Sequence, residues 1–427
     1  MRELLRLPGY WRLASAYALN QLGWFISTIA LSYLVYRRTG SILGSSGFFL
    51  CSQALPAILG PPLVGRLDRL PPRVLLPALY GGEALLYALL AWLTGRFALV
   101  PVLVLVVLDG ILALAAGAIA VAARTEILKP AGLVREGGAV ASLSFSAAYL
   151  LGPLLGGFVT AVGGTGGALL LNSVLFALMG LALLSRSIPA RTVHEGPERR
   201  RLRAALRHVR ANRPVMTLLT MQTLVYICFS ISTPLEVVYT VHTLHAGSTG
   251  YGLLMAVWGG AALVGSFAYA RLRHGDALIL IGVAVVLGAL GFTELAVAPT
   301  LAVALLGAVL IGASNGLSTV LFSVELQEIV PQSWMALAMS FNGALLLIAP
   351  GIGIAIGGLL GALVSVRFAF VVSAAASVVF AGLGLMSLAV SRPVGRGAGT
   401  EVAGASGQTV AGAEGDAEAG VRSGTPA

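Results

Sequence analysis

This 427-residue sequence contains few charged residues: 10% of its residues are charged and 57% are hydrophobic. A soluble chain carries about 25% charged residues, so a soluble fold of this length could not cover its surface. The solvent must therefore be a lipid bilayer, where only helices or closed barrels satisfy their backbone. The apolar runs are continuous over about twenty residues, which favours helices over the alternating pattern of barrel strands.

Other scarce residues exclude further classes of protein. Two Cys and five scattered His give no metal-ligand or Cys–His spacing. The sole Lys, Lys129, precedes a Pro, so the sequence has no phosphate-binding Gly-Lys-Ser/Thr loop. We therefore expect no metal, no cofactor and no enzymatic activity. The net charge of +10 comes from Arg in short loops between apolar runs, where it indicates membrane orientation rather than nucleic-acid binding.

Hydropathy predicts twelve transmembrane helices in two blocks of six, at 1–185 and 215–390, with the fifth and sixth helices at 138–162 and 166–185. A basic linker at 186–214 joins the blocks. Within it, Leu202, Leu206 and Val209 form an apolar stripe flanked by Arg, which predicts an amphipathic helix against anionic headgroups. Residues 391–427 are rich in Gly, Ala, Ser and Thr, which predicts a disordered tail.

Basic residues concentrate in the N-terminal stretch, the linker and the loops near 66–73, 124–135 and 271–273. This distribution places both termini in the cytoplasm. Because Arg greatly outnumbers Lys, a bias typical of a high-GC bacterial genome, we expect a bacterial plasma membrane.

The two blocks resemble each other. Gly60 to Leu67 matches Gly265 to Leu272, and Gly117 to Glu126 matches Gly316 to Glu325, each pair offset by about 200 residues. Two six-helix repeats are typical of secondary transporters, whose substrate binds near the midplane between the halves.

The loop from Gly65 through Asp68 and Arg69 to Arg73 resembles the cytoplasmic signature of the major facilitator superfamily. Here Arg66 directly follows the Gly, and Pro71-Pro72 replaces a Gly–basic pair. The segment from Gly152 to Gly157 is similar to a Gly-Pro motif of antiporters in the same superfamily. The stretch Leu34 to Ser41 resembles its drug- and siderophore-exporting branch, which includes the enterobactin exporter and macrolide-efflux proteins. The resemblance implies a twelve-helix fold, alternating access, and a cavity lined by the first, fourth, seventh and tenth helices.

Charged residues at the linker side predict a gate. Opposite charges at the membrane edge can lock one helix arrangement and release in another, although the basic residues alone could serve only topology. The predicted gate consists of Gly65, Asp68, Arg69, Arg73, Arg124 and Glu126. Small residues and a Pro let helices approach closely and kink, so either a rocking hinge or plain tight packing is expected at Gly152, Pro153, Gly156 and Gly157.

Acids inside a membrane span are costly and are candidates for function. Asp109 lies in the middle of the fourth span, Glu236 in the seventh and Glu83 in the third. Each is a candidate proton- or substrate-binding group, with a hydrogen-bonded structural acid as the alternative. Neutral polar residues could bind substrate or bridge helices at Asn20, Gln21, Gln222 and Asn315. Aromatic residues could form an amphiphile-binding wall or simply pack at Trp24, Phe25, Tyr149 and Trp258.

These observations predict an all-α polytopic transporter that exports an amphiphilic small molecule, such as a drug, siderophore or secondary metabolite, in exchange for protons. We expect it to be monomeric and to bind neither nucleic acid nor a metal. A metabolite importer or uniporter of the same fold and a non-transporting receptor or assembly protein remain alternatives.

Overall fold

The computed structural model describes residues 4, 7, 9–67, 70–184, 212–272, 276–330 and 332–391. Within these ranges every long element is a helix, which confirms the all-α prediction. The elements in chain order are α1 (Tyr10–Thr39), α2 (Ile42–Phe49), η2 (Leu50–Ala54), α3 (Leu55–Leu67), α4 (Pro72–Leu93), α5 (Leu99–Leu128), α6 (Val134–Ala182), α8 (Arg213–Val238), η3 (Tyr239–Thr243), α9 (Gly247–Leu272), α10 (Ala277–Val297), α11 (Leu301–Ile329), α12 (Gln332–Leu363) and α13 (Val366–Ser391).

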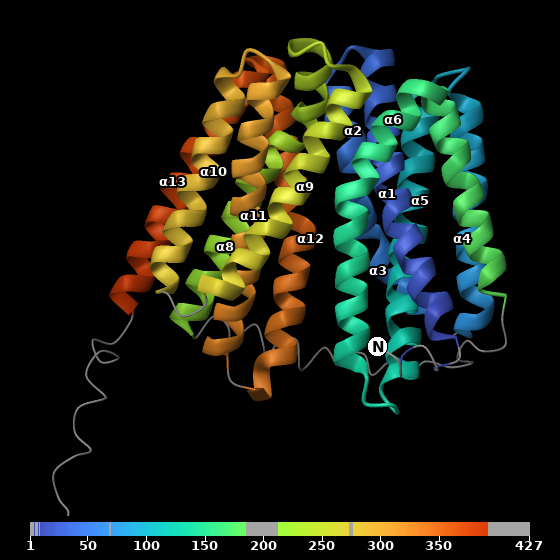
Figure 1. Ribbon diagram of the computed structural model, residues 1–427, viewed down its shortest axis with the longest axis horizontal. Coiled ribbons are helices and arrows are strands. Elements are labelled where there is room, and N and C mark those ends of the chain that lie inside the picture. The colour runs from blue at the N-terminus through green and yellow to red at the C-terminus, as the bar shows by residue number, and fades with distance from the viewer. Residues whose placement is uncertain are drawn as a thin grey trace, which may run out of the picture.

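Eleven helices of the described chain are long and apolar enough to cross a membrane. The longest, α6, has 49 residues and breaks at Gly164, whose φ of 68° and ψ of 170° are not helical. A positive φ favours Gly. The chain turns back at this residue (Figure 1), so α6 contains two antiparallel spans where the sequence predicted two separate helices. Counting α6 twice gives twelve spans.

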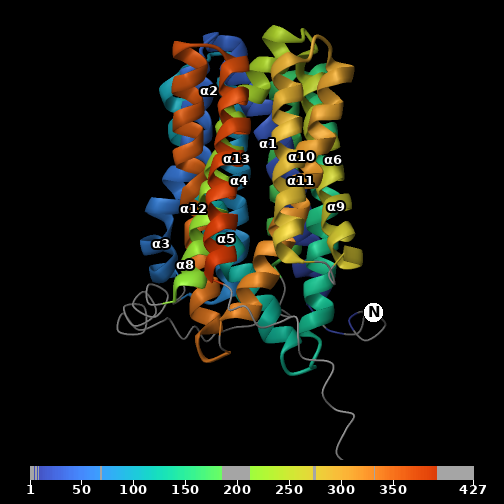
Figure 2. The same ribbon diagram turned by 90° about the vertical axis from the view of Figure 1, so that its left-hand side faces the viewer.

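The helices form two bundles, which lie side by side with their turns at two opposite ends (Figures 1 and 2). In the N-terminal bundle, α6 packs on α1 and α4, and α5 packs on α4 and α3. In the C-terminal bundle, α8 packs on α12 and α13, while α11 packs on α9 and α10. Each bundle has its own core of buried aliphatic and aromatic side chains.

Two spans contain π-helical turns. The π-helix η2 interrupts the second span at Leu50–Ala54, and η3 ends the seventh span at Tyr239–Thr243. A π-turn inserts an extra residue into the helix and is frequent at functional sites. In η2 it carries Ser52 and Gln53 into the wall of a cavity described below.

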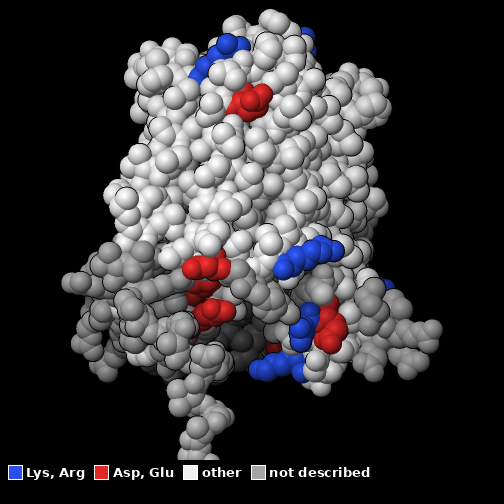
Figure 3. All heavy atoms as spheres, turned by 60° about the vertical axis from the view of Figure 1, so that its left-hand side comes forward, with Lys and Arg blue, Asp and Glu red and all other residues white. Residues whose placement is uncertain are grey.

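Charged side chains gather near the two ends of the molecule. On the face shown in Figure 3, blue and red side chains lie at the top and at the bottom, with a wide uncharged band between them. Large apolar side chains are exposed on many helices of the described chain, among them Leu85, Val286 and Val379 near the middle of their spans. A band of exposed apolar surface between charged ends is the surface that a bilayer requires.

The two ends of the molecule differ. We call one the closed end, at the turns near residues 40, 95, 164, 245, 299 and 364, and the other the linker end, where Leu184 and Asn212 flank the linker. A cluster of Ile29 and Tyr36 with Val237, Val238 and Tyr251 joins the bundles near the closed end.

Close contacts between glycines and the opposite bundle lie between the middle of the spans and the closed end. They pair Gly157 with Ser248, Gly259 with Tyr149, Gly351 with Ala54, Gly358 with Ser46 and Gly361 with Ile42. The described bundles are therefore packed together over the half of the membrane nearer the closed end.

The predicted linker helix and the polar tail lie outside the described residues, as does most of the linker.

Candidate functional site: two cavities at the bundle interface

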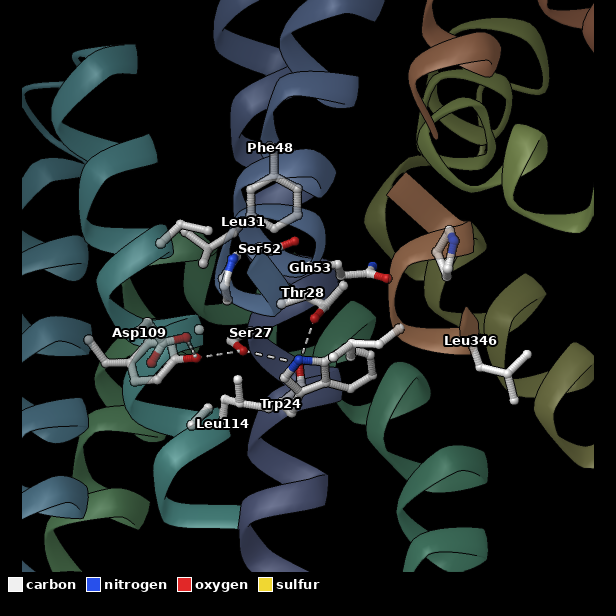
Figure 4. Close-up of a pocket in the computed structure, with 18 residues that line it drawn as sticks. Trp24, Ser27, Thr28, Leu31, Phe48, Ser52, Gln53, Asp109, Leu114 and Leu346 are labelled. Carbon is white, nitrogen blue, oxygen red and sulfur yellow. Dashed lines mark hydrogen bonds between the residues drawn. The ribbon is translucent and has the colours of Figure 1, made fainter. Parts of the chain in front are cut away.

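A cavity of about 300 Å³ lies between the bundles, with Asp109 of α5 in its wall. Residues of α1 and α5 form half of the wall, α2, η2, α3 and α4 contribute the rest on that side, and Leu346 and Leu347 of α12 reach it from the opposite bundle (Figure 4). Pro56 lies against Gly110, where a Cβ would overlap its ring. The absence of a side chain at Gly110 thus keeps α3 close to α5 beside the acid.

Asp109 belongs to a hydrogen-bonded chain that reaches α1. Its Oδ2 atom lies 2.8 Å from the Tyr87 hydroxyl oxygen, which lies 3.0 Å from Ser27 Oγ. Ser27 in turn donates to the backbone carbonyl of Trp24 over 3.0 Å. Figure 4 shows this chain running from Asp109 across to α1.

Counting hydrogens shows which protonation state completes this chain. The Tyr87 and Ser27 hydroxyls carry one hydrogen each, and a backbone carbonyl carries none. If Ser27 donates to Trp24, then Tyr87 must donate to Ser27, and the third hydrogen must come from Asp109. All three bonds therefore coexist only when Asp109 is protonated, and ionisation of Asp109 leaves hydrogens for two of them.

Glu83 lies behind this chain, one helical turn before Tyr87 on α4. Its side chain is 0% exposed, and both carboxylate oxygens are buried without a hydrogen-bond partner in the described structure. It is close enough to Asp109 to interact with it electrostatically, and Asp109 Oδ1 is likewise buried without a partner. Burying an unpaired carboxylate is costly, so such a pair favours states that hold protons.

A second cavity of about 210 Å³ holds Glu236 of α8. The carboxylate accepts a hydrogen bond of 2.9 Å from Ser232 one turn earlier. The two cavities share part of their walls, formed by Trp24, Thr28, Gln53 and Pro350. They are therefore neighbouring compartments of one region, with one acid from each bundle.

The remaining predicted polar residues divide into two groups. Asn315 of α11 lines the second cavity. Asn20 and Gln21 of α1 and Gln222 of α8 are not among the residues that line either cavity, and Gln222 is only 2% exposed.

The predicted gate is described in part, because Asp68 and Arg69 lie outside the described residues. Arg124 places its guanidinium 4.4 Å from the centre of the Tyr17 ring on α1, within the range of a cation–π contact. Glu126 and Arg73 are exposed, and Gly65 lies within α3.

The predicted hinge residues pack α6 between two helices. A Cβ at Gly152 would overlap Phe25 of α1, and one at Gly156 would lie 3.0 Å from the Ile26 Cα. On the other side, a Cβ at Gly157 would lie 2.6 Å from the Ser248 carbonyl oxygen of α9. Pro153 lines the second cavity. Three small residues thus allow α6 to touch both bundles.

Sequence reasoning missed Tyr87, Ser27 and Gln53. Tyr87 follows Glu83 by four residues, so the two share a face of α4. That spacing from a membrane-embedded acid was the one available signal. Ser27 and Gln53 are small or neutral polar residues of a kind that recurs throughout the spans, and their position beside Asp109 depends on helix packing.

Two helical bundles that enclose cavities at their interface are the architecture of secondary transporters. The sequence profile of the Major Facilitator Superfamily matches residues 13–345. The chain belongs to this superfamily.

Solved structures support the same fold. The chain is similar to the nucleoside transporter NupG, with 15% identity and a TM-score of 0.71, covering 88% of this chain and 98% of that one. It is similar to a bacterial homologue of the iron transporter ferroportin in an inward-facing state, with 18% identity and a TM-score of 0.70, covering 91% and 100%. A POT family transporter in complex with a thioalcohol-conjugated peptide has 12% identity and a TM-score of 0.68, covering 90% and 97%. No curated protein matches the sequence.

Proposed function

We propose that the protein is a secondary active transporter that exports an amphiphilic small molecule in exchange for protons. It works by alternating access in a bacterial plasma membrane, with both termini in the cytoplasm. The distribution of Arg supports this orientation. With the linker end in the cytoplasm, the packed closed end faces outward, so the described conformation is closed toward the outside.

The observation that carries the proposal is the chain from Asp109 through Tyr87 and Ser27 to α1. Gaining or losing one proton changes which hydrogen bonds this chain can hold in the wall of the first cavity: when Asp109 ionises, either a bond between two helices or the Ser27 bond to the Trp24 carbonyl within α1 is lost. In this proposal, that rearrangement of the chain couples proton binding to helix movement. Glu83 serves as the second carboxyl group of this site.

In this proposal Pro153 and Gly157 form the contact about which α6 rocks against α9, while Gly152 and Gly156 hold α6 close to α1. Arg73, Arg124 and Glu126, with Asp68 and Arg69, form the cytoplasmic gate. The anionic headgroups of the inner leaflet bind the basic linker.

Transport in vesicles with an imposed pH gradient tests the proposal. Growth of deletion and overexpressing strains on a panel of amphiphilic compounds first identifies a transported compound. In proteoliposomes, a gradient that is acidic on the outer side should then accelerate its export. Asp109→Asn should abolish the response to the gradient while exchange of labelled for unlabelled compound continues.

The matched control is Glu294→Gln. Glu294 is also an acid in an apolar helix, but it is not among the residues that line either cavity. It should leave the response to the gradient intact. If the gradient does not change the flux through the wild-type protein, proton exchange is wrong, and a uniporter becomes the better description.

A further inference from the structure

The second cavity has a wall that is unusually rich in aromatic rings. Residues from α1, α2, η2, α6, α8, α9, α11 and α12 all contribute to it. Its aromatic members are Trp24, Phe25, Phe49, Tyr149, Tyr226, Phe229, Tyr251 and Trp258.

Four of these rings form a continuous series across the bundle interface. The centre of Trp24 lies 4.8 Å from that of Phe25, Phe25 lies 4.8 Å from Tyr149, and Tyr149 lies 5.2 Å from Trp258. The first three belong to the N-terminal bundle and Trp258 to α9 of the other. Both bundles therefore hold the rings in place, and aromatic rings offer apolar area and negative π faces as binding surfaces.

Glu236 is the only acid among the described residues that line this cavity, and none of those residues is Lys, Arg or His. Its hydrogen-bond donor, Ser232, carries one hydrogen and also lies 2.9 Å from the Phe229 carbonyl. Ser232 can therefore donate to only one of these oxygens at a time. An ionised Glu236 here lacks a positively charged protein partner in the cavity wall.

These features restrict the chemistry of an occupant. An anion would meet Glu236 and the ring faces, both of which repel it. A divalent metal needs several ligands, and the described residues hold no group of three His, Cys, Asp or Glu that could bind one. A polycation would leave charges unpaired, because the wall offers one carboxylate. A monovalent organic cation satisfies both the carboxylate and the rings.

We propose that the Glu236 cavity binds a monovalent organic cation with an aromatic or aliphatic body, such as an arylalkylammonium, as the transported substrate. The cation lies against the carboxylate of Glu236 and the faces of Tyr149 and Trp258. The proton occupies the separate Asp109 cavity, so the two charges do not compete for one carboxylate. This inference rests on the proposed function for the transport step, but its binding step is independent of proton coupling.

Equilibrium dialysis of radiolabelled benzyltrimethylammonium against the purified full-length protein in a nonionic detergent tests the binding step. Wild-type protein should bind the probe saturably. Unlabelled benzyltrimethylammonium should displace it, whereas neopentylbenzene, a neutral compound of the same shape, and the anion benzenesulfonate should not. Displacement by the neutral or the anionic compound at equal concentration would overturn the proposal.

Substitutions then locate the site. Glu236→Gln should raise the dissociation constant at least about 30-fold, because removing one partner of a buried charge pair costs at least about 2 kcal/mol. Tyr149→Leu should raise it about fivefold or more through loss of a ring face. Glu294→Gln should change it less than about threefold, since this acid is not among the residues that line the cavity.

One outcome separates this inference from the proposed function. If wild-type protein binds no arylammonium while transport still follows the pH gradient, the assignment of the cation site fails and proton exchange stands.

If Glu236→Gln does not elute as a monodisperse protein, Glu236→Asp replaces it and should retain binding within about tenfold. Unchanged binding in a well-folded Glu236→Gln protein refutes the role of this carboxylate.

Discussion

Gly157→Ala should disfavour the described conformation, in which the bundles are packed together at the closed end. The population should shift toward a conformation in which the bundles separate at that end. A Cβ at this position would lie 2.6 Å from the Ser248 carbonyl oxygen and 3.1 Å from the Gly252 Cα. Ordinary contact for such a carbon begins at 3.4 Å. The difference, 3.4 minus 2.6, requires α6 and α9 to separate by about 0.8 Å, because backbone atoms rather than a flexible side chain stand in the way.

The added methyl group costs free energy only in conformations in which α6 touches α9. Overpacking of this kind costs about 1–3 kcal/mol, and a bias of that size changes a conformational equilibrium by about 5- to 150-fold. The Ser248 hydroxyl also donates to the Gly157 carbonyl over 3.3 Å, and separation of the helices weakens this bond as well. The described conformation should lose population by a factor within that range.

Distances between spin labels measure this shift. Gly95 and Thr300 are exposed at the closed end, one in each bundle, and can carry labels as Cys in a protein in which Cys51 and Cys228 are replaced by Ser. Pulsed electron paramagnetic resonance should show a larger fraction of long distances in Gly157→Ala. The matched control is Gly167→Ala in the second span of α6, where a Cβ would meet nothing within 4 Å.

An unchanged distance distribution in a Gly157→Ala protein that unfolds at the wild-type temperature would refute the reasoning. It would mean that the backbone contact between α6 and α9 does not discriminate between conformations. A shift of equal size in Gly167→Ala would point to a general effect of Ala on the helix instead.

Three further predictions follow from other features described above, the hydrogen-bonded chain at Asp109, the buried Glu83 and the glycine packing of α11. Tyr87→Phe removes the hydroxyl between α4 and Asp109, so the response of transport to a pH gradient should fall several-fold while the protein stays folded. Wild-type protein should lose thermal stability as the pH rises, because Glu83 would ionise without a partner, and Glu83→Gln should remove part of this loss. Unfolding followed by tryptophan fluorescence at several pH values checks this. Gly316→Ala should destabilise the protein by about 1–3 kcal/mol, because a Cβ there would overlap the Ala262 backbone, whereas Gly282→Ala meets nothing. Equal melting temperatures of these two Gly variants would contradict the packing described for α9 and α11.

The spans and the membrane-embedded acids could be predicted from the sequence because both depend on local composition. A run of twenty apolar residues identifies a helix wherever it packs, and an acid such as Asp109 or Glu236 stands out within one. The superfamily was predicted from the Gly65 loop and the Gly152 segment, and the match over residues 13–345 confirms it. The finer assignment to a drug- and siderophore-exporting branch remains a prediction.

The sequence could not predict in the same way which side chains of a span point toward the cavity, the protein core or the lipid. In a soluble helix, polar residues mark the outer face, but in these spans both the lipid face and the buried face are apolar. Gln222, a candidate for binding substrate or for bridging helices, is not among the residues that line either cavity, whereas Gln53 reaches the cavity wall through the π-helical turn η2. Tyr87 meets Asp109 only because α4 and α5 pack in one register, which no local pattern encodes.

The ring series from Trp24 to Trp258 has a consequence for spectroscopy. The chain contains five Trp, and two of them belong to this series, one on each side of the bundle interface. Tyr149 lies 5.2 Å from Trp258 and 4.8 Å from Phe25, so any rocking of α9 against α6 changes the surroundings of the Trp258 indole directly. Intrinsic fluorescence of the unlabelled protein should therefore follow the opening and closing of the interface in real time, with Trp258→Phe identifying the part of the signal that comes from the moving contact.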